Sequence, residues 1–263
     1  MRLLFYGDLV AKSGKDILKA TLPELKKEFN VDMVVANGEN SAGGLGINAQ
    51  SMREIFDAGV NVITLGNHVW SKDDTYDLVS NNPRLIRPGN LPENLPGKGL
   101  VIFTLPNGEK VAIINLIGRH NCGELNQGDP FACADKLVKE AKTQTNMIFV
   151  DFHAEATSEK GAMAWHLDGR VGVVVGTHTH VQTADERILP RGTALLTDVG
   201  MTGPYDSILG VEPELSIYKL TTGMMCRYKP ATGRGHVNAV VVDLDPVKGI
   251  CREIIRINRV VEL

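Results

Sequence analysis

Residues that can bind metal ions or transfer protons follow short apolar runs in this sequence. They are Asp8 after 3–6, Glu39 and Asn40 after 33–36, Asn67 and His68 after 60–65, His153 after 147–152, and His178 and His180 after 171–175. Carboxylates, amide oxygens and imidazoles together suit iron, manganese or zinc, whereas magnesium prefers oxygen ligands alone. The residue types therefore predict a transition-metal site.

The number of these side chains exceeds what one ion needs if it is to keep an open position. Two adjacent divalent ions bridged by a carboxylate would use them. Such a pair lowers the pKa of a bridging water and holds phosphoryl oxygens during in-line attack. The sequence thus favours hydrolysis of a phosphate ester over a structural zinc site, which would usually contain cysteine ligands.

Each of these residues also has a structural interpretation when it is taken alone. Asp8 could be a turn residue, Asn67 a turn asparagine and His153 a hydrogen-bonded histidine at the margin of the core. His178 and His180 would face the same way if the chain is extended there. Their joint occurrence after successive apolar runs favours one shared metal site.

The elements that would position these residues alternate along the chain. The apolar runs are short and rich in β-branched residues, as in buried strands. Helical patterns occupy 13–29, 51–58, 71–79, 129–141 and 158–167. Ser71 and Asp74 resemble a capping box, and Asp129 with Pro130 forms a helix start. This alternation predicts parallel strands whose carboxyl ends line one edge of a sheet, where ligands bind.

Other segments favour additional strands. The runs 100–105 and 111–117 flank Asn107 and Gly108, which is a strong hairpin signal. The C-terminal third is expected to be mostly strand, at 188–197, 236–244 and 250–260. The predicted fold is an α/β sandwich, in which two packed mixed β-sheets are flanked by helices. Residues 1–263 are expected to form a single domain.

The composition excludes several classes of protein. A net charge of −3 and an aromatic content of 5% disfavour binding to a nucleic-acid duplex or to long single strands. No stretch approaches the roughly 20 apolar residues of a membrane span, and the first residues do not resemble a signal peptide. The four cysteines are widely spaced, so we expect reduced thiols in a cytoplasmic protein. P-loop and GxSxG motifs are both absent.

Several sequence blocks resemble the calcineurin-like metallophosphoesterase superfamily, and specifically its bacterial YmdB-like branch. They are GDLV at 7–10, NGENSAGG at 37–44, TLGNHVW at 64–70, DFHAEATSEK at 151–160, GTHTHVQTAD at 176–185 and TDVGMTGPYDSILG at 197–210. The chain departs from the wider superfamily at Val10, where a histidine is usual, at Glu39, which replaces an aspartate, and at Val69, where many members carry an acidic residue. These departures agree with the YmdB-like branch.

The resemblance implies roles for the residues at the predicted site. One ion would be held by Asp8, Asn40 and His180, the other by Asn67, His153 and His178, with Glu39 bridging the two ions. His68 would be the general acid that protonates the leaving oxygen. The resemblance also implies two divalent ions, with iron favoured over manganese or zinc, a small phosphodiester substrate such as a 2′,3′- or 3′,5′-cyclic nucleotide, and a homo-oligomer.

Three other functions remain open at this point. A phosphomonoesterase would use the same metals on a different ester. A regulatory protein would bind a nucleotide or a partner and hydrolyse little, although it would have little use for a proton donor such as His68. A purely structural metal site would predict that chelation unfolds the protein. Glu155 and Thr179, beside the predicted ligands, are candidates to hydrogen-bond them.

Overall fold

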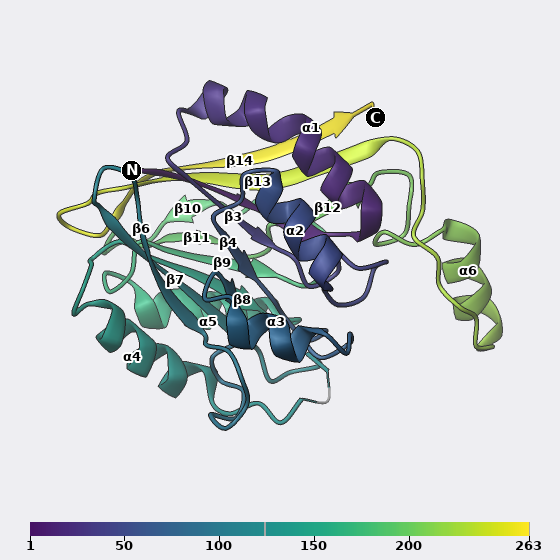
Figure 1. Cartoon of the computed structure of the whole chain (residues 1–263), viewed down its shortest axis with the longest axis horizontal. Coiled ribbons are helices and arrows are strands. Elements are labelled where there is room, and N and C mark those ends of the chain that lie inside the picture. The colour runs from purple at the N-terminus through teal and green to yellow at the C-terminus, as the bar shows by residue number, and fades with distance from the viewer. Residues whose placement is uncertain (124, 263) are drawn as a thin grey trace.

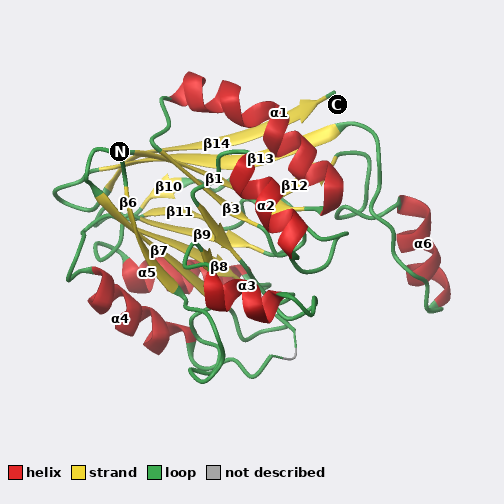
Figure 2. Ribbon diagram, in the orientation of Figure 1, coloured by secondary structure: helices red, strands yellow, loops and turns green. Residues whose placement is uncertain are grey.

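The computed structural model describes residues 1–123 and 125–262 and contains two β-sheets packed face to face between outer layers of helices. Figure 2 shows the strands in the middle of the molecule and helices on both outer faces. One helix, α6 (Pro213–Thr222), projects away from the rest of the chain (Figures 1 and 2). The predicted α/β sandwich of two mixed sheets is confirmed.

The first sheet contains most of the N-terminal strands and the long C-terminal pair. Its strands are β1 (Arg2–Tyr6), β2 (Asp8–Leu9), β3 (Met33–Asn37), β4 (Val62–Thr64), β5 (Leu85–Ile86), β12 (Met201–Pro204), β13 (Gly235–Leu244) and β14 (Cys251–Val261). The order is β2-β12-β13-β1-β3-β4-β5, and β14 pairs with β13. Strands β1, β3, β4 and β5 are parallel, as the alternation of strands and helices predicted.

The second sheet is built from the middle of the chain. Its strands are β6 (Leu100–Thr104), β7 (Lys110–Ile117), β8 (Ile148–His153), β9 (Val173–Thr177), β10 (Arg187–Ile188) and β11 (Ala194–Leu196), in the order β10-β11-β9-β8-β7-β6. Strands β6 and β7 form the predicted antiparallel hairpin. Strands β7, β8, β9 and β11 are parallel, so their carboxyl ends lie at one edge.

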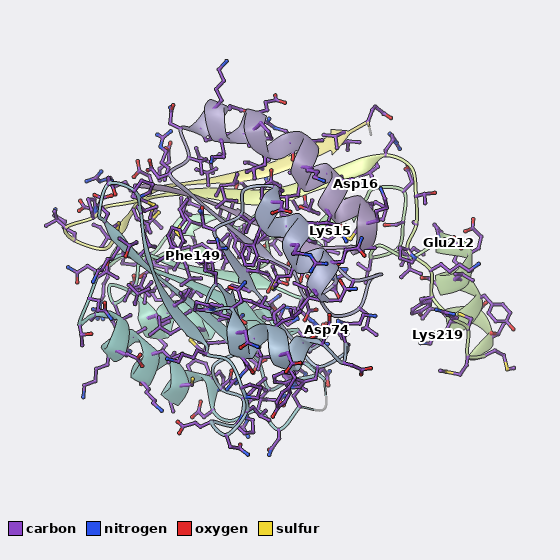
Figure 3. All side chains as sticks on the ribbon, in the orientation of Figure 1. Lys15, Asp16, Asp74, Phe149, Glu212 and Lys219 are labelled. Atoms are coloured by element: carbon purple, nitrogen blue, oxygen red, sulfur yellow. The ribbon has the colours of Figure 1, made fainter. Side chains whose placement is uncertain are left out.

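Successive side chains along each strand point to opposite faces of its sheet, so apolar residues cover both faces. Leu4 and Tyr6 pack under the helices α1 (Ala11–Phe29), α2 (Ala49–Asp57) and α3 (Thr75–Asn81). Leu3 and Phe5 instead face the second sheet, where the rings of Phe5 and Phe149 lie 5.1 Å apart (Figure 3 labels Phe149). The helices α4 (Pro130–Ala141) and α5 (Thr157–Leu167) cover the outer face of the second sheet.

Two helix starts tested the capping predictions. The Asp129 carboxylate accepts hydrogen bonds from the backbone N–H groups of Phe131 and Ala132, so this predicted cap is confirmed. The prediction of a capping box at Ser71 was wrong. Helix α3 begins at Thr75, and the Asp74 carboxylate accepts from the backbone N–H of Ala49 instead, because the start of α2 lies beside it.

The C-terminal third contains a helix that the sequence pattern did not predict. Only Ser216 of α6 is buried, so the helix has no buried apolar stripe to produce a helical period. The expected strand at 188–197 is divided into β10 and β11 by a turn at 189–193. Within the described residues, no helix is both long and apolar enough to cross a bilayer.

Candidate metal centre

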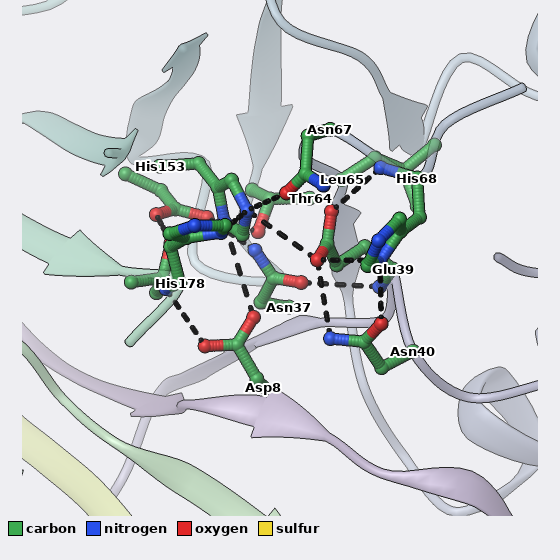
Figure 4. Close-up of polar contacts among 12 residues, drawn as sticks. Asp8, Asn37, Glu39, Asn40, Thr64, Leu65, Asn67, His68, His153 and His178 are labelled. Atoms are coloured by element: carbon green, nitrogen blue, oxygen red, sulfur yellow. Dashed lines mark hydrogen bonds and ion pairs between the residues drawn. The ribbon is translucent and has the colours of Figure 1, made fainter. Parts of the chain in front are cut away.

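The ends of strands from both sheets bring all eight predicted site residues together. Figure 4 shows seven of them in one cluster, and His180 joins it through a 3.0 Å contact between its Nε2 and Asn40 Nδ2. Asp8 is the first residue of β2, directly beyond β1, and His153 is the last residue of β8. The face-to-face packing of the sheets places these two strand ends opposite each other.

The Glu39 carboxylate lies at the middle of the cluster and is almost fully buried. Its Oε1 is 3.3 Å from His153 Nε2, 3.2 Å from His68 Nδ1 and 3.1 Å from Asn40 Nδ2. Its Oε2 accepts a hydrogen bond from the backbone N–H of His68 at 3.1 Å. Glu39 therefore contacts residues on both sides of the cluster, which is the position that a bridging carboxylate requires.

Each of three imidazoles in the cluster is oriented by a partner outside it. His153 Nδ1 donates to Thr177 Oγ1 at 2.9 Å, because the Thr177 hydroxyl itself donates to Asp151. His178 Nε2 lies 3.1 Å from Glu155 Oε2. A third pair joins His180 Nδ1 to the carbonyl oxygen of Leu209 at 3.0 Å. These contacts leave the other ring nitrogen of each histidine free to face the cluster.

Asp151 links the second sheet to the first beneath the cluster. Its Oδ1 accepts from Thr177 at 2.8 Å, and its Oδ2 accepts from Thr64 at 2.5 Å and from Asn37 Nδ2 at 3.1 Å. Burial raises the pKa of Asp151 to about 6 despite these hydrogen bonds. Thr177, Asp151 and the Leu209 carbonyl were not singled out from the sequence, although all three stand within quoted blocks, at 176–185, 151–160 and 197–210.

Several buried atoms in the cluster have lone pairs that face one another. Nε2 of His153 lies 2.8 Å from Asn67 Oδ1 and 3.0 Å from His178 Nδ1. Asp8 Oδ1 is buried without a hydrogen-bond partner among the described residues. Such an arrangement is unfavourable unless a proton or a cation lies between the acceptor atoms. A carboxylate oxygen of Asp8, one of Glu39 and a nitrogen of His153 all lie within 4.8 Å of one another.

Gly66 leaves space beside these atoms. A Cβ atom at this position would lie 2.2 Å from Glu39 Oε2 and 2.5 Å from His153 Nε2. Any larger residue would displace the two side chains from their positions. The free lone pairs, the unpartnered oxygen of Asp8 and the mixture of carboxylate, amide and imidazole donors all fit a divalent transition-metal site.

The charges in the cluster are strongly coupled. Burial raises the pKa of Asp8, although His180 and His153 oppose this effect. Burial would also raise the pKa of Glu39, but attraction to His153 outweighs it and holds that pKa well below its usual value. The same attraction overcomes burial at His153 and raises its pKa to about 9. Burial and then repulsion by His153 lower the pKa of His178 to about 3, so His178 is neutral at pH 7.

The backbone bends at His178 and His180, so the prediction of an extended chain at these residues was wrong. Both residues have positive φ, of 103° and 64°. This backbone is unfavourable for side chains with a Cβ and must be held by its surroundings. The backbone N–H of His178 donates to Asp8 Oδ2 at 3.0 Å, and that of Thr179 donates to Asp198 Oδ2 at 3.2 Å. The shared direction of the two imidazoles therefore comes from tertiary contacts.

One expectation at the cluster needs correction, and a second requires a change in side-chain orientation. The Thr179 hydroxyl donates to the Val181 carbonyl and does not contact an imidazole, because the bend turns it outwards. At Asn40 the amide nitrogen, which cannot bind a cation, faces His180, while Oδ1 accepts from His68 Nδ1 at 2.8 Å. The Asn40 amide would have to turn over to offer its oxygen beside His180.

Comparisons with known proteins agree with the quoted sequence blocks. A family model described as YmdB-like protein matches residues 4–257. The chain is 48% identical over 245 residues to a 2′,3′-cyclic-nucleotide 2′-phosphodiesterase of Bacillus subtilis, covering 93% of this chain and 92% of that protein.

Two solved structures share the fold across nearly the whole chain. A crystal structure described as a novel phosphatase from Mycoplasma pneumoniae is 35% identical, with a TM-score of 0.93, covering 100% of this chain and 94% of the other. A hypothetical protein of Thermus thermophilus is 37% identical, with a TM-score of 0.91 and coverage of 99% and 100%. The chain therefore belongs to the YmdB-like family of the metallophosphoesterase fold.

Proposed function

We propose that this chain hydrolyses small phosphodiesters, such as 2′,3′- or 3′,5′-cyclic nucleotides, with two divalent transition-metal ions. The observation that carries the proposal is the meeting of seven potential ligands, six of them gathered around the buried Glu39, with His68 at the edge of the cluster. The Bacillus subtilis relative supports the choice of a cyclic-nucleotide diester.

The family resemblance divides the potential ligands into two groups that share Glu39. We assign Asp8, Asn40 and His180 to one ion, Asn67, His153 and His178 to the other, and Glu39 to both. When bound, the two ions would neutralise charge on the phosphoryl oxygens and supply a hydroxide nucleophile at neutral pH. The mixed donor set favours iron, with manganese or zinc as alternatives.

We assign His68 as the general acid that donates a proton to the leaving oxygen. Its side chain is 32% exposed, whereas Glu39 beside it is 1% exposed, so the His68 ring lies where the cluster meets solvent. Its Nδ1 lies 3.2 Å from Glu39 Oε1, a contact that does not depend on the orientation of the Asn40 amide. Because Nδ1 faces the Glu39 carboxylate, Nε2 is the ring nitrogen left free to protonate the departing alkoxide.

Hydrolysis of two diesters by metal-loaded protein tests this function. The His68→Ala variant should keep its metal but lose about 10²- to 10⁴-fold in turnover of 2′,3′-cyclic AMP. It should lose less with bis-p-nitrophenyl phosphate, because nitrophenolate leaves without a proton. Asp8→Ala should lose both metal and activity. His166→Ala, whose ring pairs with Asp135 on the outer helices, is the matched control. Undiminished turnover in both site variants would reject the assigned residues.

Phosphomonoesterase activity is the second candidate, and the Mycoplasma pneumoniae relative described as a phosphatase favours it. The ratio of turnover on p-nitrophenyl phosphate and on its bis ester separates the two activities. A regulatory protein would instead bind nucleotide tightly without turnover. A proton donor in place at His68 supports an enzyme over that alternative.

We also propose that the protein is a cytoplasmic homo-oligomer, with residues 1–263 as one domain. The four cysteines are free, which supports a reducing compartment. The projecting α6 and the residues after it expose Ile217, Leu220 and Met225, and a second copy could cover them. Light scattering of the purified protein and of Leu220→Glu measures the association state. A monomer at micromolar concentration would contradict this part of the proposal.

A further inference from the structure

We propose that a basic groove beside His180 binds a second phosphate group of the substrate. The favoured substrate is then a nucleotide that carries a phosphate in addition to the diester being hydrolysed. This inference rests on the proposed function, because it assigns the reacting diester to the metal centre. It adds a binding site that lies outside the cluster of potential ligands.

The groove has a volume of about 640 Å³, which is within the range of small-molecule sites. Its walls are the glycine-rich turn at 43–45, the segment 209–211 and the segment 227–230. The last two segments are held together by backbone hydrogen bonds, from Glu212 N to Lys229 O at 3.0 Å and from Ala231 N to Gly210 O at 2.9 Å. The backbone at the base of the arm that carries α6 therefore forms one wall.

Three cationic side chains line the groove, and no carboxylate does. They are Lys72, Arg227 and Lys229. Within the described part of the chain, none of the three forms an ion pair, although the nearby Arg234 is paired with Asp206 at 2.7 Å. Three unpaired cations from two separate segments repel one another in the empty groove. An anionic ligand with several acceptor oxygens, such as a phosphate monoester, would relieve this repulsion.

The groove opens onto the metal centre through His180. This residue lines the groove, while its Nε2 contacts Asn40 in the cluster. Its other nitrogen donates to the carbonyl of Leu209, which is a groove residue too. A ligand whose reacting phosphate lies beside His180 can therefore extend into the groove that Lys72 and Lys229 line.

Tyr228 suggests the chemistry of the part that joins the two phosphates. Its ring is part of the groove lining and is 44% exposed. The Lys219 ammonium of α6 lies 4.8 Å from the ring centroid and helps to hold the ring in place (Figure 3 labels Lys219). An aromatic ring among cations suits a nucleoside, because a base can pack on it. A nucleotide with two phosphates thus matches both features of the lining.

Binding of two product-like ligands tests the inference without relying on turnover. Calorimetry on metal-loaded protein would compare adenosine 3′-monophosphate with adenosine 3′,5′-bisphosphate. The bisphosphate should bind about tenfold or more tightly, because its 5′-phosphate gains charge-assisted hydrogen bonds. The variant Lys72→Ala/Arg227→Ala/Lys229→Ala should bring the ratio of the two affinities close to one. Arg227→Gln alone should give an intermediate ratio.

A matched control removes the same charge elsewhere. The variant Lys26→Ala/Lys27→Ala/Lys139→Ala loses three exposed cations far from the groove and should keep the wild-type ratio. Equal affinity of the two ligands for wild type, or the same fall in both variants, would overturn the inference. If the ratio behaves as expected but bis-p-nitrophenyl phosphate is not hydrolysed, the proposed function fails while the groove assignment stands. If bis-p-nitrophenyl phosphate is hydrolysed but the two ligands bind equally well, the groove assignment alone is rejected.

Discussion

The Thr177 hydroxyl joins His153 Nδ1 to the buried carboxylate of Asp151. We expect Thr177→Val to weaken metal binding about 10- to 100-fold, because the imidazole loses the contact that selects its tautomer. The variant should also destabilise the fold by about 1–3 kcal/mol, since Asp151 Oδ1 is left buried and unpaired. Competition with a chelator measures the first effect and urea denaturation the second. Thr177→Ser retains the hydroxyl and should keep both metal affinity and stability close to wild type. Unchanged metal binding in Thr177→Val would exclude a role for the hydroxyl in orienting His153.

Substitution of Gly66 tests whether metal binding needs the space that this glycine leaves inside the cluster. In Gly66→Ala the new Cβ would lie 2.2 Å from Glu39 Oε2, so Glu39 and His153 must move. Metal affinity should fall at least about tenfold, as for other changes that misplace ligands. Gly161→Ala is the control, because nothing lies within 4 Å of its added Cβ and its helix should gain about 0.5–1 kcal/mol. Metal titrations of both variants make the comparison. Equal affinities would show that the space is not needed.

At the scale of elements, a buried ion pair fastens helix α5 to the loop between β11 and β12. Lys160 Nζ lies 2.6 Å from Asp198 Oδ2, and both side chains are 1% exposed. Asp198 also accepts from the backbone N–H of Thr179 and of Gly200. The pair therefore supports the bend that carries the two histidines, and the stem of Lys160 passes under β9 at Gly176.

Breaking this pair should be costly. We expect Lys160→Met to destabilise the protein by about 3–5 kcal/mol, because it leaves the Asp198 charge buried without its partner. Lys136→Met is the matched control, since the pair between Lys136 and Glu93 is exposed and screened by solvent and should contribute little to stability. Urea denaturation of both metal-free variants measures the difference. A loss below about 1 kcal/mol in Lys160→Met would contradict this account of the bend.

At the scale of the whole molecule, three buried apolar clusters stabilise the fold independently of the metal centre. One lies between the sheets and the other two lie beneath the outer helices. Chelation should therefore abolish diester hydrolysis while most of the secondary structure persists, in contrast to a structural metal site. Circular dichroism and activity, followed during chelation and after metal is returned, check this. Loss of the helical signal together with activity would favour a structural site.

The order of strands and helices was predictable because buried parallel strands leave short β-branched runs in the sequence, as at 33–36 and 171–175. Those runs also placed Glu39 and His178 at strand ends. The helix α6 left no such signal, because its apolar side chains are exposed and follow no buried stripe. A single sequence therefore predicted the layers well and the projecting arm poorly.

By itself, the sequence determined which residue types stand at the strand ends, and with them the metal chemistry and the family resemblance. Only the tertiary structure decided how the two sheets meet, which nitrogen of each histidine faces the cluster, and how a bend with positive φ aims His178 and His180. The physical reason is that each of these depends on a partner from a distant segment. Thr177 and Leu209 select tautomers, and Asp8 and Asp198 hold the bend, through contacts that exist only once the layers have packed.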